Sequence, residues 1–260
     1  MSVSKNYRDN LGRLKHEENG ATAPDNFPPS QNYLKISYNP ATVLKFVLLI
    51  IFCLVLLSTL GELYSHFGSD ARFSRTVRLF FLDREKTIPA FYSSLALFFC
   101  GILLAVIAKG KYQKHDKYRR YWKFLSWIFV YLAIDENVGI HELTGAPVKN
   151  MLNISGFLSY AWVIPGIILF SLFVLVYLKF VLSLPAKIKV LFISAAAIFV
   201  TGALGIEMIG ANLHVLKGTD NWAYVMVFTI EETLEMVGIA VFMYALLEYL
   251  KQYVEPLKIG

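Results

Sequence analysis

The sequence has few charged residues and almost no cysteine. Only 17% of its 260 residues are charged, whereas 56% are hydrophobic, which is typical of an integral membrane protein. The two cysteines, Cys53 and Cys100, each lie midway along an apolar run, where we expect a small buried hydrophobic side chain and no chemistry. The first apolar run lacks a short core followed by a small-residue cleavage site, so we expect a membrane anchor rather than a secretory signal.

The sequence also lacks a recognisable nucleic-acid-binding module, although its net charge is +6. Its basic residues flank apolar runs and have no base-stacking aromatic module around them. Lipid phosphate therefore explains the positive charge better, and we expect membrane lipid rather than nucleic acid as the partner.

Several apolar runs exceed the roughly 20 residues that are needed to cross a hydrocarbon core of about 30 Å. We therefore predict an all-α, polytopic membrane protein with a bundle of six transmembrane helices. The expected helices are 41–67, 88–108, 121–143, 157–180, 188–214 and 222–249. This arrangement places 17 Lys and Arg residues on one side and seven on the other, so both termini are expected in the cytoplasm and the bilayer is expected to be the cell (plasma or inner) membrane.

The predicted organisation has three parts. Residues 1–40 mix charges with Asn, Ser and Pro and are expected to be a disordered cytoplasmic tail. The transmembrane domain covers 41–250, and 251–260 form a cytoplasmic C-terminal tail. In the first outer connection, arginines that include Arg72 and Arg75 alternate with apolar residues, which predicts either a short amphipathic helix at the interface or a plain solvated connector.

Ionisable residues inside the apolar runs are the strongest functional signal. Each costs roughly 2.5 to 3.5 kcal/mol at membrane depth, so a group of them needs partners, protons or metal. The predicted topology places all of them in the outer half of the membrane, which indicates one buried acidic site. They are Glu62, His66, Asp135, Glu136, His141, Glu142, Glu207, His214, Glu231, Glu232 and Glu235.

Helical spacing groups most of these residues into pairs, because residues four or seven apart share a face of a helix. The pairs are Glu62 with His66, Asp135 with Glu142, Glu207 with His214, and Glu231 with Glu235. Glu136, His141 and Glu232 fall off those faces. Gly139 offers a place where the helix can distort, so Glu136 and His141 are kept as candidates.

Clustered carboxylates without a Lys or Arg inside the nearby helices need a counter-charge. When histidines are also present, a few polyvalent cations can supply that charge. Imidazole and carboxylate ligands suit Fe, Mn or Zn, so we expect two transition-metal ions, with Fe first. The arrangement resembles di-metal carboxylate bundles only in its chemical logic, since their Glu-x-x-His pairs are absent. The expected ligands are Glu62, His66, Asp135, Glu136, His141, Glu142, Glu207, His214, Glu231 and Glu235, with Glu232 and Glu136 as catalytic proton carriers.

These residues support three functions. The first is a membrane metalloenzyme that oxidises, hydroxylates or hydrolyses a lipid-soluble substrate from the outer leaflet. The second is a transporter or channel for protons or divalent cations, which needs a route that the acid-free inner halves of the helices do not offer. The third is a structural subunit whose polar groups fix helix packing, with a second copy or another membrane subunit as partner. A haem protein ranks below these three.

Overall fold

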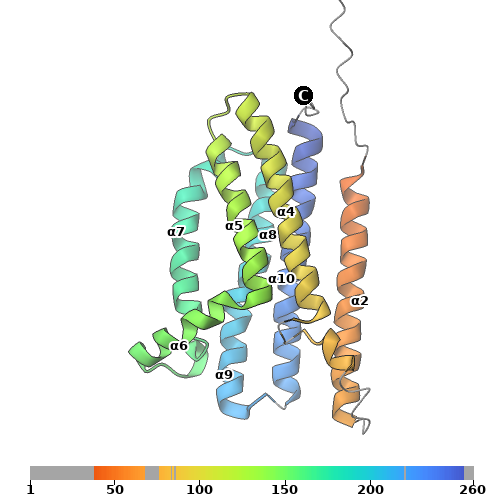
Figure 1. The fold of residues 1–260 in the computed structure, drawn as a ribbon, viewed down its shortest axis with the longest axis vertical. Coiled ribbons are helices and arrows are strands. Elements are labelled where there is room, and N and C mark those ends of the chain that lie inside the picture. Colours follow the sequence, from red (N-terminus) through yellow and green to blue (C-terminus); the bar gives the residue numbers. More distant parts are fainter. Residues whose placement is uncertain (1–37, 68–75, 83, 85, 220, 255–260) are drawn as a thin grey trace, which may run out of the picture. The chain divides into compact units, whose positions relative to one another are not determined.

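Long helices form nearly all of the chain in the computed structural model, which describes residues 38–67, 76–82, 84, 86–219 and 221–254 (Figure 1). Within these residues there is no β-strand, so the predicted all-α class is confirmed. The calls on the two tails concern 1–37 and 255–260, which lie outside the described residues.

Four helices are long and apolar enough to cross a membrane, which indicates a multi-pass membrane protein. The first three are α2 (Pro40–Phe67), α4 (Ile88–Gln113) and α7 (Val163–Leu182). The fourth is one continuous helix with three parts: α8 (Ala186–Val200), the π-helical turn η3 (Thr201–Ile206) and α9 (Glu207–Lys217).

Two further long helices complete the bundle, α5 (Arg119–Val138) and α10 (Trp222–Tyr253), and both carry several charged residues. Helix α5 packs along α4, while α10 contacts α2, α4 and α8 and so lies at the centre of the bundle (Figure 1). All six predicted helices are therefore helical in the structure, and four of them have the length and hydropathy of membrane spans.

The third predicted helix, 121–143, ends earlier than expected. Helix α5 stops at Val138, and Gly139 adopts the left-handed conformation (φ 65°, ψ 40°) that a residue without Cβ reaches at no steric cost. A separate helix, α6 (Ile140–Leu152), then runs sideways from the end of α5, below α7 (Figure 1). Asp135 and Glu142 consequently do not share one helix face, and their predicted pairing is wrong.

The two connections at the α6 end contain short helical turns. In the first connection, the structure has the short turn η1 (Arg78–Phe80). The two predictions for this connection were an amphipathic helix and a plain solvated connector, and the residues Arg72 and Arg75 lie outside the described residues. The Leu82 amide N–H donates to the Ser58 hydroxyl over 3.1 Å, which holds this connection on α2. In the second, η2 (Gly156–Leu158) precedes α7, so the fourth long helix begins later than the predicted residue 157.

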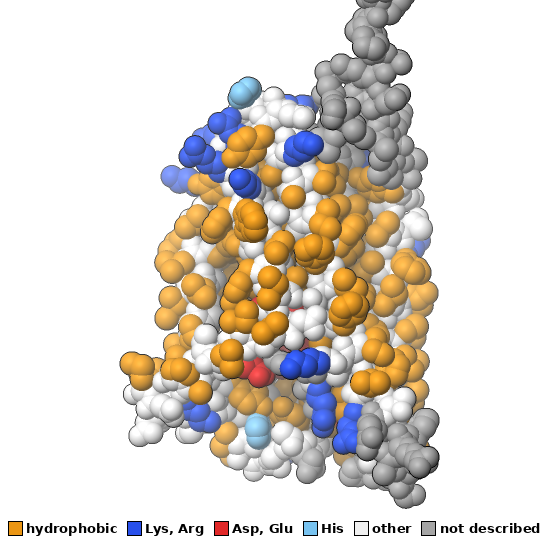
Figure 2. All heavy atoms as spheres, in the orientation of Figure 1, with side chains coloured by type: hydrophobic (Ala, Val, Ile, Leu, Met, Phe, Trp, Pro, Cys, Tyr) orange, Lys and Arg blue, Asp and Glu red, His pale blue; other side chains and the backbone are white. Residues whose placement is uncertain are grey.

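The opposite end of the bundle, where α4 joins α5 and α7 joins α8, is closed by aromatic packing. Trp122 is 1% exposed, and its ring centre lies 5.0 Å from that of Phe180 and 4.7 Å from that of Tyr249. Lys and Arg side chains gather on the surface over this end (Figure 2), which we call the basic end. Of the two cysteines, Cys100 is fully buried as predicted, whereas Cys53 is exposed on α2.

Candidate functional site

The π-helical turn η3 directly precedes Glu207 and brings the backbone of this helix very close to α10. A Cβ added to the buried Gly202 would lie 2.8 Å from the carbonyl oxygen of Glu231 and 3.1 Å from Cγ of Glu235. Only glycine fits such an approach. A π turn within an α-helix often marks a functional site, and this one lies beside three acidic residues.

Glu207 is the centre of a group of carboxyl side chains. The indole N–H of Trp162 donates to its Oε1 over 2.9 Å, and Glu207 also shares a side-chain hydrogen bond with Glu231 of α10. Glu231 is only 8% exposed. A carboxylate has acceptor atoms only, so two carboxyl groups can hydrogen-bond to each other only when one of them holds a proton. The two carboxyl groups are therefore close enough to share a proton.

Further carboxyl groups reach the same place from α10 and from one more helix, α5. Glu235, one turn further along α10, interacts electrostatically with Glu232, with Glu136 of α5 and with Glu207. Helix α9 fits closely here because Gly210 faces Glu231, whose Oε2 would lie 3.7 Å from an added Cβ. Figure 2 shows only small areas of Asp and Glu side chains on this face, partly covered by other side chains. We call the five residues Glu136, Glu207, Glu231, Glu232 and Glu235 the Glu207 cluster, and the end of the bundle that holds them the acidic end.

His141, the second residue of α6, contacts Asp135 of α5 across the break at Gly139. Its Nδ1 lies 3.0 Å from Oδ2 of Asp135, and its backbone N–H donates to Oδ1 of the same carboxylate over 2.8 Å. Burial lowers the pKa of His141, but the hydrogen bond and the charge of Asp135 outweigh burial, so the pKa lies above its ordinary value of 6.5. The imidazole ring also packs on Trp162, with 4.6 Å between ring centres, and so connects this pair to the partner of Glu207.

A second polar chain lies at the rim of the acidic end. The hydroxyl of Tyr160 lies 2.7 Å from Nδ1 of His214 and 3.1 Å from the hydroxyl of Tyr224. Burial, followed by the hydrogen bond with Tyr224, raises the pKa of Tyr160 well above its ordinary value, so this phenol keeps its proton. Glu207 and His214, predicted to share a face, thus both contact the short stretch between η2 and α7.

Tyr160 and Trp162 were not predicted as site residues, because the sequence placed them inside the fourth transmembrane helix. Their one signal is position, since two aromatic residues with polar tips stand directly before an uninterrupted apolar run. In the structure this stretch precedes α7 and is fixed to α9, where the Ser159 hydroxyl donates to the carbonyl oxygen of Ala211 over 3.0 Å.

The remaining predicted site residues lie apart or stay undecided. Glu62 is half-buried near the end of α2, Glu142 is exposed in the first turn of α6, and the side chain of His66 lies outside the described residues. In the part of the chain that the structure describes, no three His, Cys, Asp or Glu side chains are arranged as a group that could hold a metal ion. The two predicted metal ions and their ligand set therefore stay a prediction.

A protein-family model, described as "Domain of unknown function (DUF8692)", matches residues 47–249. This match runs from α2 to α10 and contains every residue of the Glu207 cluster. No curated protein and no solved structure matches the chain.

Proposed function

We propose that this chain, which belongs to the DUF8692 family of domains of unknown function, is a membrane-embedded enzyme that transfers protons at the Glu207 cluster and acts on a lipid-soluble substrate. The observation that carries the proposal is the proximity of the carboxyl groups of Glu207 and the buried Glu231, on two helices that glycines bring close together. General acid–base catalysis needs a proton donor and a proton acceptor at one place, and this pair supplies both. Glu136 and Glu232, predicted as proton carriers, are members of the same cluster.

The surroundings of the cluster favour catalysis over transport. The bundle around it presents hydrophobic side chains to the bilayer (Figure 2), so a lipid-soluble substrate approaches without leaving the membrane. Transport requires a polar route to the opposite side. In the described residues, that direction is filled by packed aromatic rings, including those of Trp122, Phe180 and Tyr249.

The proposal includes six membrane crossings, with α5 and α10 added to the four apolar spans. A helix of 20 residues is about 30 Å long, so α5 is sufficient for one crossing. With six crossings, the excess of Lys and Arg places both termini in the cytoplasm of a cell-membrane protein. A reporter fused after Gly260 should be cytoplasmic, while one inserted after Lys149 should be outside; the reverse result would refute this topology.

The proposed proton transfer uses carboxyl groups, and the described residues do not present a group of ligands for a metal ion. The predicted Fe, Mn or Zn is tested separately, by the metal content of purified protein. If His141 and Glu207 are ligands or support ligands, His141→Ala and Glu207→Ala should each lower metal affinity by roughly 10- to 100-fold. His115→Ala, at the basic end, is the control, and equal metal content in all variants would remove the metal prediction.

The proposed activity is tested in liposomes made from the lipids of the source membrane. The balanced reaction for this acid–base pair is hydrolysis, in which water is the co-reactant: one bond of a lipid-soluble component breaks, and the products together weigh one water more, as mass spectrometry detects. Glu207→Gln should reduce this rate by about 100-fold or more because the proton acceptor is lost. Glu248→Gln, which changes a buried acid at the basic end, should retain the rate.

A pH-sensitive dye inside the same liposomes distinguishes the transporter hypothesis. Proton flux that depends on Glu207, without any change in lipid masses, would overturn the proposed enzyme and favour transport.

A further inference from the structure

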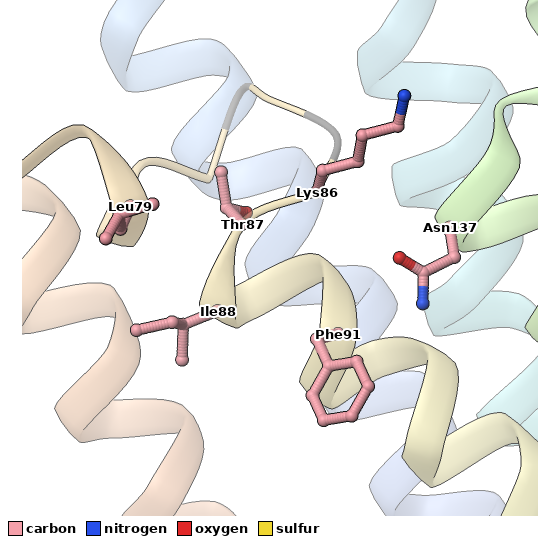
Figure 3. A pocket seen from close by; sticks show the side chains of 6 residues that line it. All are labelled: Leu79, Lys86, Thr87, Ile88, Phe91 and Asn137. Carbon is pink, nitrogen blue, oxygen red and sulfur yellow. The ribbon is translucent and has the colours of Figure 1, made fainter.

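A cavity of about 320 Å³ lies between the start of α4 and the end of α5, outside the Glu207 cluster. Figure 3 shows its two unlike sides. Lys86, from the connection before α4, and Asn137, from the last turn of α5, lie on one side, whereas Leu79 and Ile88 lie on the other. Phe91 and Thr87 of the α4 start complete the lining. The cavity is therefore polar at one side and apolar at the other.

Lys86 supplies a positive charge at the polar side of the cavity. Its ammonium group forms no ion pair with any other described residue. Its backbone is left-handed (φ 61°), a conformation that costs a residue with Cβ roughly 1 to 3 kcal/mol and that clusters at ligand-binding places. The fold thus holds a strained lysine at the mouth of a cavity.

The groups around Lys86 favour an anion. Asn137 adds a side-chain amide that donates hydrogen bonds. The cavity also lies at the N-terminus of α4, a helix of 26 residues, where the helix dipole favours negative charge. Thr87 accepts a hydrogen bond from the Ala90 N–H and so caps this terminus.

The apolar side favours a hydrocarbon chain. Leu79, Ile88 and Phe91 are 50%, 42% and 55% exposed, although each belongs to the wall of the cavity. The volume is at the low end of the roughly 300 to 1,000 Å³ of ligand pockets, which suits one chain rather than two.

We propose that this cavity binds a single-chain anionic amphiphile from the bilayer, a long-chain carboxylate, with its headgroup at Lys86 and Asn137 and its chain along Leu79, Ile88 and Phe91. Two donors match the two oxygens of a carboxylate. The binding site does not depend on the chemistry of the Glu207 cluster, so oleate binding and the proposed enzyme activity are tested independently.

The test measures binding of radiolabelled oleate, ionised at pH 8, to full-length protein in nanodiscs of phosphatidylcholine. Lys86→Asn removes the charge while keeping a residue that tolerates the left-handed backbone. It should weaken oleate binding about tenfold, the loss expected for one charge-assisted hydrogen bond. Lys86→Arg, which keeps the charge, should retain binding.

Lys149→Asn, which changes an exposed lysine of α6 outside the cavity, is the matched control and should bind oleate as wild type does. Oleyl alcohol, the neutral analogue, should bind more weakly than oleate and should not respond to Lys86→Asn. Equal oleate binding by wild type and Lys86→Asn, or equal binding of oleate and its alcohol, would overturn the proposal. Displacement of oleate by lysophosphatidate at lower concentration would overturn the choice of a carboxylate.

Discussion

Buried carboxyl groups have different partners at the two ends of the bundle. At the basic end, Glu248 forms an ion pair with Lys187 and accepts a hydrogen bond from the side chain of Gln252. The backbone carbonyl group of the preceding residue, Leu247, accepts a hydrogen bond from the Tyr38 hydroxyl over 3.1 Å. One carboxylate is thus matched by two donors.

At the acidic end, carboxyl groups are placed beside other carboxyl groups. Glu207 has one neutral donor, Trp162, and shares its other hydrogen bond with Glu231. Close packing here comes from glycines such as Gly202 rather than from large rings. The same type of residue is therefore paired with donors at one end and grouped with other carboxyl groups at the other.

The largest effect is expected from filling the close contact between η3 and α10. Gly202→Ala places a Cβ 2.8 Å from a backbone carbonyl oxygen, so the helices must move apart, at a cost of about 1 to 3 kcal/mol. Gly205→Ala, in the same turn, meets its nearest atom only at 4.0 Å and should not destabilise the protein. Melting temperatures in detergent check the contrast, and equal values would refute the close packing.

The next effect concerns the pair of Asp135 and His141. Because this pair raises the pKa of His141 above 6.5, its stabilisation is complete below that pH and is lost as the pH rises through the raised value. Asp135→Asn should therefore cost about 1 to 2 kcal/mol at pH 6 and much less at pH 9. Melting curves of both proteins across this range should converge at high pH, and parallel curves would contradict the assignment.

A smaller effect is expected from the indole of Trp162. Trp162→Phe keeps an aromatic ring against His141 but removes the N–H donor of Glu207, at a cost of about 1 kcal/mol. Trp127→Phe is the control, because Trp127 is 63% exposed on α5. Infrared difference spectra should also show a shifted carboxyl band in Trp162→Phe alone; an unchanged band would mean that this hydrogen bond does not act on the pair.

The smallest effect is expected at the basic end, from Lys187→Ala. The lysine side chain is about half exposed, and water screens an ion pair of this kind. Its removal should leave the melting temperature nearly unchanged, because Gln252 still donates to Glu248. A loss as large as that of Gly202→Ala would show that the ion pair, rather than ring packing, holds this end together.

The sequence predicted the helices well because their apolar runs are long and are separated by charges, loops or prolines. It also predicted that acids from several helices share one depth, and the structure places Glu136, Glu207, Glu231, Glu232 and Glu235 near one another. Helical spacing correctly aligned Glu231 with Glu235, since α10 is regular from end to end.

Other features follow from departures from regular helix that spacing does not reveal. The break at Gly139 brings Asp135 to His141 rather than to Glu142, although the glycine was a visible warning. Trp162 and Tyr160, the partners of Glu207 and His214, belong to a non-helical stretch, and Lys86 belongs to a connection. Helical spacing therefore does not predict any of the three.

The π-helical turn before Glu207 sets the rotational position of every residue after it. A π turn holds one residue more than an α turn, and each residue of an α-helix turns the chain by about 100°. If all six residues of Thr201–Ile206 adopted regular α-helix, the helix after them would rotate by about that angle. Glu207 and His214 would then both face away from α10 and from the stretch 159–162, although no side chain had been replaced. Deleting one residue from this turn would instead give a regular helix that keeps the later residues in their present orientation, so the π geometry, rather than the length of the chain, directs these two side chains toward their partners.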